Sequence, residues 1–180
     1  TLDVFDAKLV AAGEALASSR QRLVAALEPQ LREAYDAVAR TSAEVRARYS
    51  PPWMDTGLAE ALAAARTDDL RRGVSTVGPH RDELDLALGE LPARTHASQG
   101  EQRSLALALR LASHHVVTDK TESSPVLLLD DVFSELDPER SDALLESLPP
   151  GQTVLSTAGG LPTGASPGLV LQVRDGSVEA

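Results

Sequence analysis

The sequence predicts an α/β fold that carries a separate helical arm. Apolar residues recur at helical spacing as far as residue 72, and from residue 73 short apolar strands alternate with helices. Hydrophobic residues make up 42% of the chain but aromatic residues only 3%, so the core is built from Leu, Val and Ala, which suits helices and parallel strands. We therefore predict a helical arm over residues 1–72 and an α/β lobe over residues 73–180.

Composition and charge exclude several classes of protein. The 180 residues contain no cysteine, which excludes disulfides and thiolate chemistry and makes a reducing cytoplasm the expected location. The net charge is -10, so any contact with DNA must be local or shared with absent parts. No apolar run approaches the ~20 residues of a membrane span, so no membrane partner is expected. The chain begins without methionine, and we expect it to be cut from a longer protein.

The arm is expected to be entirely helical. Two long amphipathic helices are predicted between Leu2 and Tyr49, with Pro29 as the place for a kink. The segment SPPW breaks this pattern, because proline disfavours helix in the residue before it, and a shorter helix is predicted over residues 56–72. The apolar positions that define the long helices are Leu9, Leu16, Leu23, Leu27, Leu31, Tyr35 and Val38.

The lobe is expected to begin with a strand at VSTVGPH, followed by a hairpin strand in which leucines alternate before Gly89. A helix is predicted from residue 99 to about residue 117, with Ser98 as its N-cap. The uninterrupted run VLLL predicts a central parallel strand. The remaining elements are a capped helix at DPERSDALLESL, a strand at TVLST and an edge hairpin formed by LVLQV and the turn RDG.

Two adjacent carboxylates, Asp130 and Asp131, end the run VLLL. Open α/β folds bind ligands at the carboxyl ends of their strands. The first acid suits coordination of Mg²⁺ through water, and the second suits positioning or deprotonating an attacking water. The alternative is a strand that ends in two solvated acids. The segment SELD directly afterwards favours the functional interpretation.

The segment SQGEQR offers a hydroxyl, a glycine and free amide groups at the start of a helix. Backbone N–H groups and the helix dipole favour an anion there, so a phosphate would fit beside Ser98 and Gly100. The alternative is that Ser98 only caps the helix, which is the better interpretation of this segment alone. Together with Asp130 and Asp131 downstream, however, the segment is better interpreted as a phosphate site.

SQGEQR, LLLDD and SELD, in this order, resemble the signature, Walker B and D-loop motifs of ABC-type ATPases. LDVFDAKL near the start and TVGPHRDEL before ASQGEQRSLALALRLA narrow the resemblance to the carboxyl-terminal half of the RecF family of DNA replication and repair proteins. The resemblance extends over nearly the whole chain, and the combination of motifs is highly specific.

The resemblance implies the carboxyl-terminal lobe of an ABC/SMC-like P-loop ATPase head, with the helical arm as its lid. Such a protein binds ATP and Mg²⁺, closes as a homodimer on single-stranded or gapped double-stranded DNA, and supports recombinase loading with other recombination mediators in repair, recombination and the SOS response. The resemblance assigns Mg²⁺ to Asp130 and catalysis to Asp131. It assigns contacts with the nucleotide or across the dimer to Ser98, Gln99, Gly100, Glu101, Ser134, Asp137 and Thr157.

Three features depart from the pattern of these ATPases. Asp131 stands where most relatives have a glutamate, and its side chain is one methylene shorter, so slow hydrolysis is expected. Ser156 and Thr157 stand where many have a histidine that senses the γ-phosphate. No Gly-Lys-Ser/Thr loop occurs, because the only lysines are Lys8 and Lys120. We expect that loop upstream of this chain and ATP hydrolysis only in the intact protein.

Other polar residues are open to two interpretations. GPHRDEL is either a nucleotide or DNA contact or a structural turn with an Arg81–Asp82 ion pair. His114 and His115 lack a nearby third metal ligand and are expected on the helix surface. The arginines of the arm either meet a phosphate backbone or form a solvated face. They are Arg20, Arg22, Arg32, Arg40, Arg46 and Arg48.

Three other identities compete with this prediction. A head of the SMC and Rad50 type would lead into long heptad repeats, and none occurs in the chain. A transporter ATPase subunit is disfavoured by GPHRDEL and by the acidic, arm-bearing layout. A noncatalytic interaction fragment is the third alternative, and it would describe the isolated chain correctly.

Overall fold

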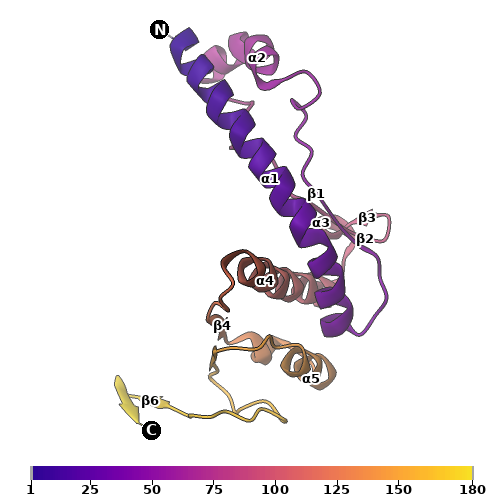
Figure 1. Cartoon of the computed structure of the whole chain (residues 1–180), viewed down its shortest axis with the longest axis vertical. Coiled ribbons are helices and arrows are strands. Elements are labelled where there is room, and N and C mark those ends of the chain that lie inside the picture. Colours follow the sequence, from indigo (N-terminus) through magenta and orange to yellow (C-terminus); the bar gives the residue numbers. More distant parts are fainter. Residues whose placement is uncertain (1, 180) are drawn as a thin grey trace.

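A computed structural model describes residues 2–179, in which helices and short strands follow the long first helix (Figure 1). Figure 1 shows α2 beside the amino end of α1, and α4 crossing the carboxyl half of α1. The elements are α1 (Leu2–Ala39), β1 (Val45–Arg48), α2 (Leu58–Arg72), β2 (Asp85–Leu88), β3 (Leu91–Pro92), α3 (Ala93–His96), α4 (Gln99–Thr121), β4 (Leu127–Asp130), the 3₁₀ helix η1 (Val132–Glu135), α5 (Pro138–Glu146), β5 (Thr153–Ser156), β6 (Gln172–Arg174) and β7 (Ser177–Glu179).

The predicted pair of long helices is one helix, α1, of 38 residues. Pro29 lies inside it, although proline removes a backbone hydrogen bond and crowds the preceding turn. Leu27 and Leu31, on either side of Pro29, are buried in one core, so tertiary packing offsets the local cost. The prediction of a second long helix is wrong, because residues 45–48 form a strand.

The main core lies where α1 crosses α4. Tyr35 and Val38 of α1 are fully buried there, as are Ala108 and Ala112 of α4. The small alanine side chains allow the two helices to approach closely. A second core joins the amino half of α1 to α2 and contains Ala17, Tyr49, Trp53, Leu58 and Leu62. Because α1 contributes to both cores, the boundary at residue 72 stays a prediction.

A small antiparallel sheet orders its strands β1-β2-β3. Val45 and Ala47 of β1 are buried, whereas Arg46 and Arg48 point away from the core, as the alternation of a half-buried strand requires. The all-helical interpretation of the arm is therefore wrong at β1. The predicted strand at the start of VSTVGPH is also wrong, whereas the turn predicted at its end is present: residues 74–84 form bends, a turn at residues 79–80 and irregular segments, with Gly78 at φ 130°.

The predicted strand at VLLL forms and pairs in parallel with β5. Leu127 and Leu129 are buried against the core, whereas Leu128 on the opposite face is 70% exposed. Val126 and Val154 are exposed as well. The predicted hairpin β6–β7 forms at the far end of the molecule (Figure 1). One face of the β4–β5 sheet is therefore apolar and open.

None of the helices described between residues 2 and 179 combines the length and the apolar character that crossing a membrane requires.

Candidate functional site

Asp130 and Asp131 lie at the carboxyl end of β4, as predicted, and both are exposed. The Ser156 hydroxyl of the neighbouring strand donates a hydrogen bond to the Asp130 carboxylate. Asp131 takes the left-handed conformation, with φ 49°, which aspartate tolerates better than most residues. Its backbone N–H donates to the Ser156 carbonyl at 3.0 Å. The two carboxylates are thus held at the edge of the parallel sheet.

The SELD segment (residues 134–137) runs from η1 to the start of α5. Ser134 Oγ donates to the carbonyl of Asp131 at 2.9 Å, and Asp137 caps α5 by accepting from the Arg140 N–H at 2.9 Å. Ser134 and Thr157 line one pocket of about 440 Å³. The fold therefore places Ser134 and Thr157 close to Asp130 and Asp131.

The SQGEQR segment (residues 98–103) begins α4, and Ser98 is its N-cap, as predicted. The Ser98 hydroxyl accepts from the Glu101 N–H at 3.3 Å, and the Ser98 N–H donates to the Glu101 carboxylate at 2.8 Å. Together they form a capping box. The Glu101 carboxylate accepts from the Ser98 hydroxyl at 2.7 Å and from the Ser98 N–H, and these two bonds, aided by the nearby Arg140 guanidinium, lower the pKa of Glu101. The N–H groups of Gln99 and Gly100 lie in the first turn, where no intrahelical acceptor exists.

The predicted site residues thus gather in two groups. The strand-end group comprises Asp130, Asp131, Ser134 and Thr157, and the helix-end group comprises Ser98, Gln99, Gly100 and Glu101. Asp137 stands between them: its carboxylate lies 3.2 Å from Nη1 of Arg140, and the same guanidinium covers Gly100.

Sequence reasoning missed the arginines that join these groups. Arg103 of SQGEQR forms an ion pair with Glu135 of SELD, with 3.1 Å between Nε and Oε2. Arg140 pairs with Asp137 and covers Gly100. The spacing of Arg140 three residues after an N-cap aspartate was a signal for the local pair. Nothing in the sequence alone indicated the contact with Gly100.

The residues present are chemically suited to Mg²⁺ and to phosphate. Asp130 offers a carboxylate beside the Ser156 hydroxyl, and Mg²⁺ prefers such oxygen ligands while keeping several waters. The start of α4 offers N–H groups and the positive end of a helix dipole. No group of three His, Cys, Asp or Glu side chains suited to a metal occurs among residues 2–179. A cation held by Asp130 would therefore take its other ligands from water or nucleotide.

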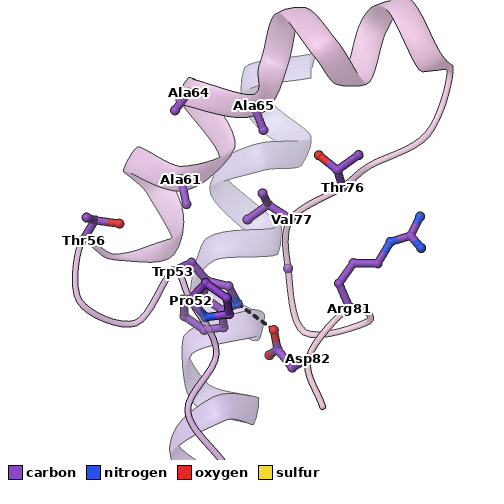
Figure 2. A pocket seen from close by; sticks show the side chains of 11 residues that line it. Pro52, Trp53, Thr56, Ala61, Ala64, Ala65, Thr76, Val77, Arg81 and Asp82 are labelled. Carbon is purple, nitrogen blue, oxygen red and sulfur yellow. Dashed lines mark hydrogen bonds between the residues drawn. The ribbon is translucent and has the colours of Figure 1, made fainter.

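Asp82 of the GPHRDEL segment (residues 78–84) is a structural residue whose partners differ from the prediction. Its side chain is 2% exposed and lies 3.8 Å from Nη1 of Arg20. It accepts hydrogen bonds from the Tyr49 hydroxyl at 2.6 Å and from Nε1 of Trp53 at 2.8 Å (Figure 2). The predicted Arg81–Asp82 ion pair is therefore wrong. Asp82 thus connects its turn to α1 through Arg20 and to the second core through Tyr49 and Trp53.

A pocket of about 550 Å³ lies beside Asp82, between α2 and the turn that carries Val77 (Figure 2). Its walls are largely apolar side chains from both segments. Arg81 donates from Nε to the Ser75 carbonyl at 3.1 Å, and the His80 ring lies 3.2 Å from the same carbonyl. A nucleotide or DNA role for the GPHRDEL segment stays a prediction.

Replacing Asp82 with alanine is expected to destabilise the protein by about 2–3 kcal/mol, because buried Tyr49 and Trp53 donors lose their acceptor. Glu83→Ala, at the exposed neighbouring position, is the matched control and is expected to change stability by less than about 0.5 kcal/mol. Urea denaturation followed by tryptophan fluorescence measures both. Equal stabilities of the two variants would contradict the structural role of Asp82.

The arginines of the arm make contacts within the chain. Arg32 pairs with Glu28 at 2.7 Å, and Arg40 pairs with Glu146 at 3.0 Å. Arg46 pairs with both Glu44 and Glu90. These acidic neighbours favour a neutralised, solvated face over a stripe that binds phosphate backbone.

His114 is buried, with 7% of its surface exposed, so the expectation that it lies on the helix surface is wrong. Its Nε2 lies 2.9 Å from the carbonyl of Pro125. This contact ties α4 to the chain just before β4. His115, one residue further on, is exposed, as predicted.

Comparison with known sequences finds many similar curated proteins. The chain is 45% identical over 167 residues to the DNA replication and repair protein RecF of Streptomyces avermitilis, which covers 88% of this chain and 44% of that protein. No family model matches the chain. The chain spans about half the length of this curated relative.

Solved structures agree with this likeness. The recombination mediator protein RecF-ATP of the RecFOR pathway matches with a TM-score of 0.81 and 26% identity, over 99% of this chain and 49% of that one. RecF-ATPrS of the same pathway matches with a TM-score of 0.82 and 24% identity, over 99% and 50%. An SmcHead bound to the C-winged helix domain of ScpA matches in fold, with a TM-score of 0.52 and 19% identity, over 88% and 42%. The predicted fold, an α/β lobe of an ABC/SMC-like ATPase head with a helical arm, is confirmed.

Proposed function

This chain belongs to the RecF family, of whose matched members it spans about half, and we propose that it forms one lobe of an ATP-dependent DNA recombination mediator. The intact protein would dimerise on ATP and act at single-stranded or gapped double-stranded DNA in the cytoplasm. There it would support recombinase loading together with other mediator proteins. The likeness to RecF supports this proposal.

The division of the site residues into two groups of different chemistry carries the proposal. The strand-end group offers oxygen ligands for a cation and a water, whereas the helix-end group offers donors for a phosphate. The 180 residues contain no Gly-Lys-Ser/Thr loop to cradle a triphosphate. The strand-end and helix-end groups can therefore form an ATP site only when another part of the protein, or a second copy of it, holds the nucleotide against them.

Each residue of the strand-end group would act through its own chemistry. Bound Mg²⁺ would supply charge neutralisation at the phosphates. Asp130 would hold the ion with its carboxylate, which the hydrogen bond from Ser156 orients. Asp131, whose carboxylate makes no hydrogen bond or ion pair with any described residue, is free to orient a water and accept its proton. Thr157 would place a hydroxyl near the terminal phosphate.

The helix-end group would act on the nucleotide of a second head. The N–H groups of Gln99 and Gly100 would donate to its terminal phosphate. The Ser98 hydroxyl, which here donates to the Glu101 carboxylate at 2.7 Å, would turn its proton to that phosphate, while the Ser98 N–H bond to Glu101 keeps the cap in place. Ser134 and Asp137 of the SELD segment would lie in the interface between the heads. This arrangement makes ATP the link between two copies of the protein.

The open face of the β4–β5 sheet supports a further lobe. Leu128 is 70% exposed, and Val126 and Val154 on the same sheet are about half exposed. A parallel strand is normally covered on both faces. The remainder of the ATPase head, including its phosphate-binding loop, would cover this surface.

The likeness to RecF favours that family over a head of the SMC and Rad50 type, which matches in fold only. The remaining alternative is a noncatalytic interaction fragment. The two possibilities differ in whether the strand-end and helix-end groups ever meet nucleotide, which a binding experiment decides.

The isolated 180-residue chain is expected to show no ATPase activity and no micromolar binding of Mg-ATP, because P-loop amides and their lysine supply most of the contacts to a triphosphate. Isothermal titration of the chain, with the full-length protein as the positive control, is the test. Adding the amino-terminal half in trans should restore binding. Micromolar affinity of the chain alone would contradict the split site, and failure of the full-length protein to bind would contradict the ATPase assignment.

A further inference from the structure

Two arginines join the SQGEQR and SELD segments, and the first is Arg103. Its Nε lies 3.1 Å from the Glu135 carboxylate, and its Nη1 donates to the Glu135 carbonyl at 3.2 Å. One side chain of SQGEQR thus contacts both the side chain and the backbone of SELD. A contact with the backbone fixes the position of the loop, which charge balance alone would not do.

The second arginine, Arg140, makes the reciprocal contact from α5 to α4. A Cβ atom built on Gly100 would lie 2.6 Å from Nη1 of Arg140 and 3.2 Å from its Cζ. Gly100 is not among the residues with positive φ, so its backbone does not require glycine. A side chain at position 100 would instead displace the guanidinium, which is the flexible end of Arg140, from its place over the first turn of α4.

We propose that Arg103 and Arg140 are positioning residues that hold SELD against the first turn of α4, so that both segments meet a second ATPase head as one surface. Gly100 is then needed to admit the Arg140 guanidinium. This inference rests on the proposed function, in which both segments lie at the interface between two heads.

The charges around Arg140 agree with this role. Its guanidinium pairs with Asp137 at 3.2 Å and lies over Gly100. One cation of α5 therefore contacts both SELD and SQGEQR. A lysine would supply the charge but not the planar group that lies over Gly100.

In the full-length protein, Arg103→Ala and Arg140→Ala are each expected to weaken ATP-dependent dimerisation by up to about 25-fold. An exposed ion pair contributes up to about fivefold, and a two-fold symmetric dimer contains each contact twice. Sedimentation with ATP measures dimerisation, and titration with a fluorescent ATP analogue measures nucleotide binding by the monomer, which should not change. Arg110→Ala is the matched control, because Arg110 is exposed on α4 and forms no ion pair among the described residues.

Gly100→Ala tests the pairing when it is combined with Arg140→Ala, since the added methyl group would displace the Arg140 guanidinium. The variant should weaken dimerisation as much as Arg140→Ala does. Combined with Arg140→Ala, it should add less than about twofold, because the interaction is already lost. If the two losses multiply, Gly100 does not serve Arg140 and the inference fails. It also fails if Arg140→Ala dimerises as well as Arg110→Ala, or if Arg140→Lys restores dimerisation fully.

A failure of the proposed function would look different, because the unsubstituted protein would then not dimerise with ATP at all. The positioning role has its own measurement in that case. Amide hydrogen exchange of residues 134–137 should be faster in Arg103→Ala and Arg140→Ala than in Arg110→Ala. Equal exchange in the three variants would overturn the inference.

Discussion

Ser98→Arg is expected to reduce ATP-dependent dimerisation of the full-length protein by about 100-fold or more while leaving ATP binding by each monomer intact. The larger side chain would fill the space over the first turn of α4, where the phosphate of a second head would enter. It also removes the hydroxyl that accepts from the Glu101 N–H at 3.3 Å. A positive charge at the positive end of the helix dipole also destabilises the first turn of α4. Sedimentation with and without ATP measures the effect.

Loss of the cap alone must be separated from loss of the interface. An N-cap substitution costs about 1 kcal/mol of stability, which thermal unfolding of Ser98→Arg and Ser98→Ala will report. Ser123→Arg places the same side chain on an exposed site beyond the other end of α4 and should dimerise normally. Normal dimerisation of Ser98→Arg would remove Ser98 from the interface.

Asp131→Asn is expected to lower the rate of ATP hydrolysis about 100-fold or more in the full-length protein, because an amide cannot accept a proton from the attacking water. ATP binding and dimerisation should persist. Asn also tolerates the left-handed conformation that residue 131 adopts at φ 49°. The carboxylate is exposed, so its removal leaves no buried donor unpaired. Single-turnover hydrolysis at saturating Mg-ATP measures the effect on chemistry alone.

Asp119→Asn makes the same change of charge at an exposed position on α4 and should hydrolyse ATP at the normal rate. If Asp131→Asn also retains the normal rate with excess Mg²⁺, Asp131 is not the base. Another group would then have to position the water.

The sequence by itself determined the elements whose signals are local. Ser98 predicts the start of α4, because an N-cap side chain bonds to a backbone N–H only two or three positions further on, and the structure adds Glu101 to complete a capping box. Asp137 followed by Pro138 predicts the start of α5 in the same way. The run VLLL ending in Asp130 predicts a strand that presents carboxylates at the edge of a sheet. These interactions act within a few residues, so a single sequence contains them in full.

The tertiary structure alone decided what depends on distant partners. Packing of α1 against α4 keeps α1 helical through Pro29, and pairing with β2 makes a strand of β1. Asp82 receives its hydrogen bonds from residues 49 and 53 rather than from the adjacent arginine. Arg140 meets Gly100 across 40 positions of sequence. Most local propensities are worth tenths of a kcal/mol per residue, and a proline inside a helix costs about 3 kcal/mol. Each fully buried apolar side chain contributes about 1.5–3 kcal/mol, so several three-dimensional contacts together prevail where the two conflict.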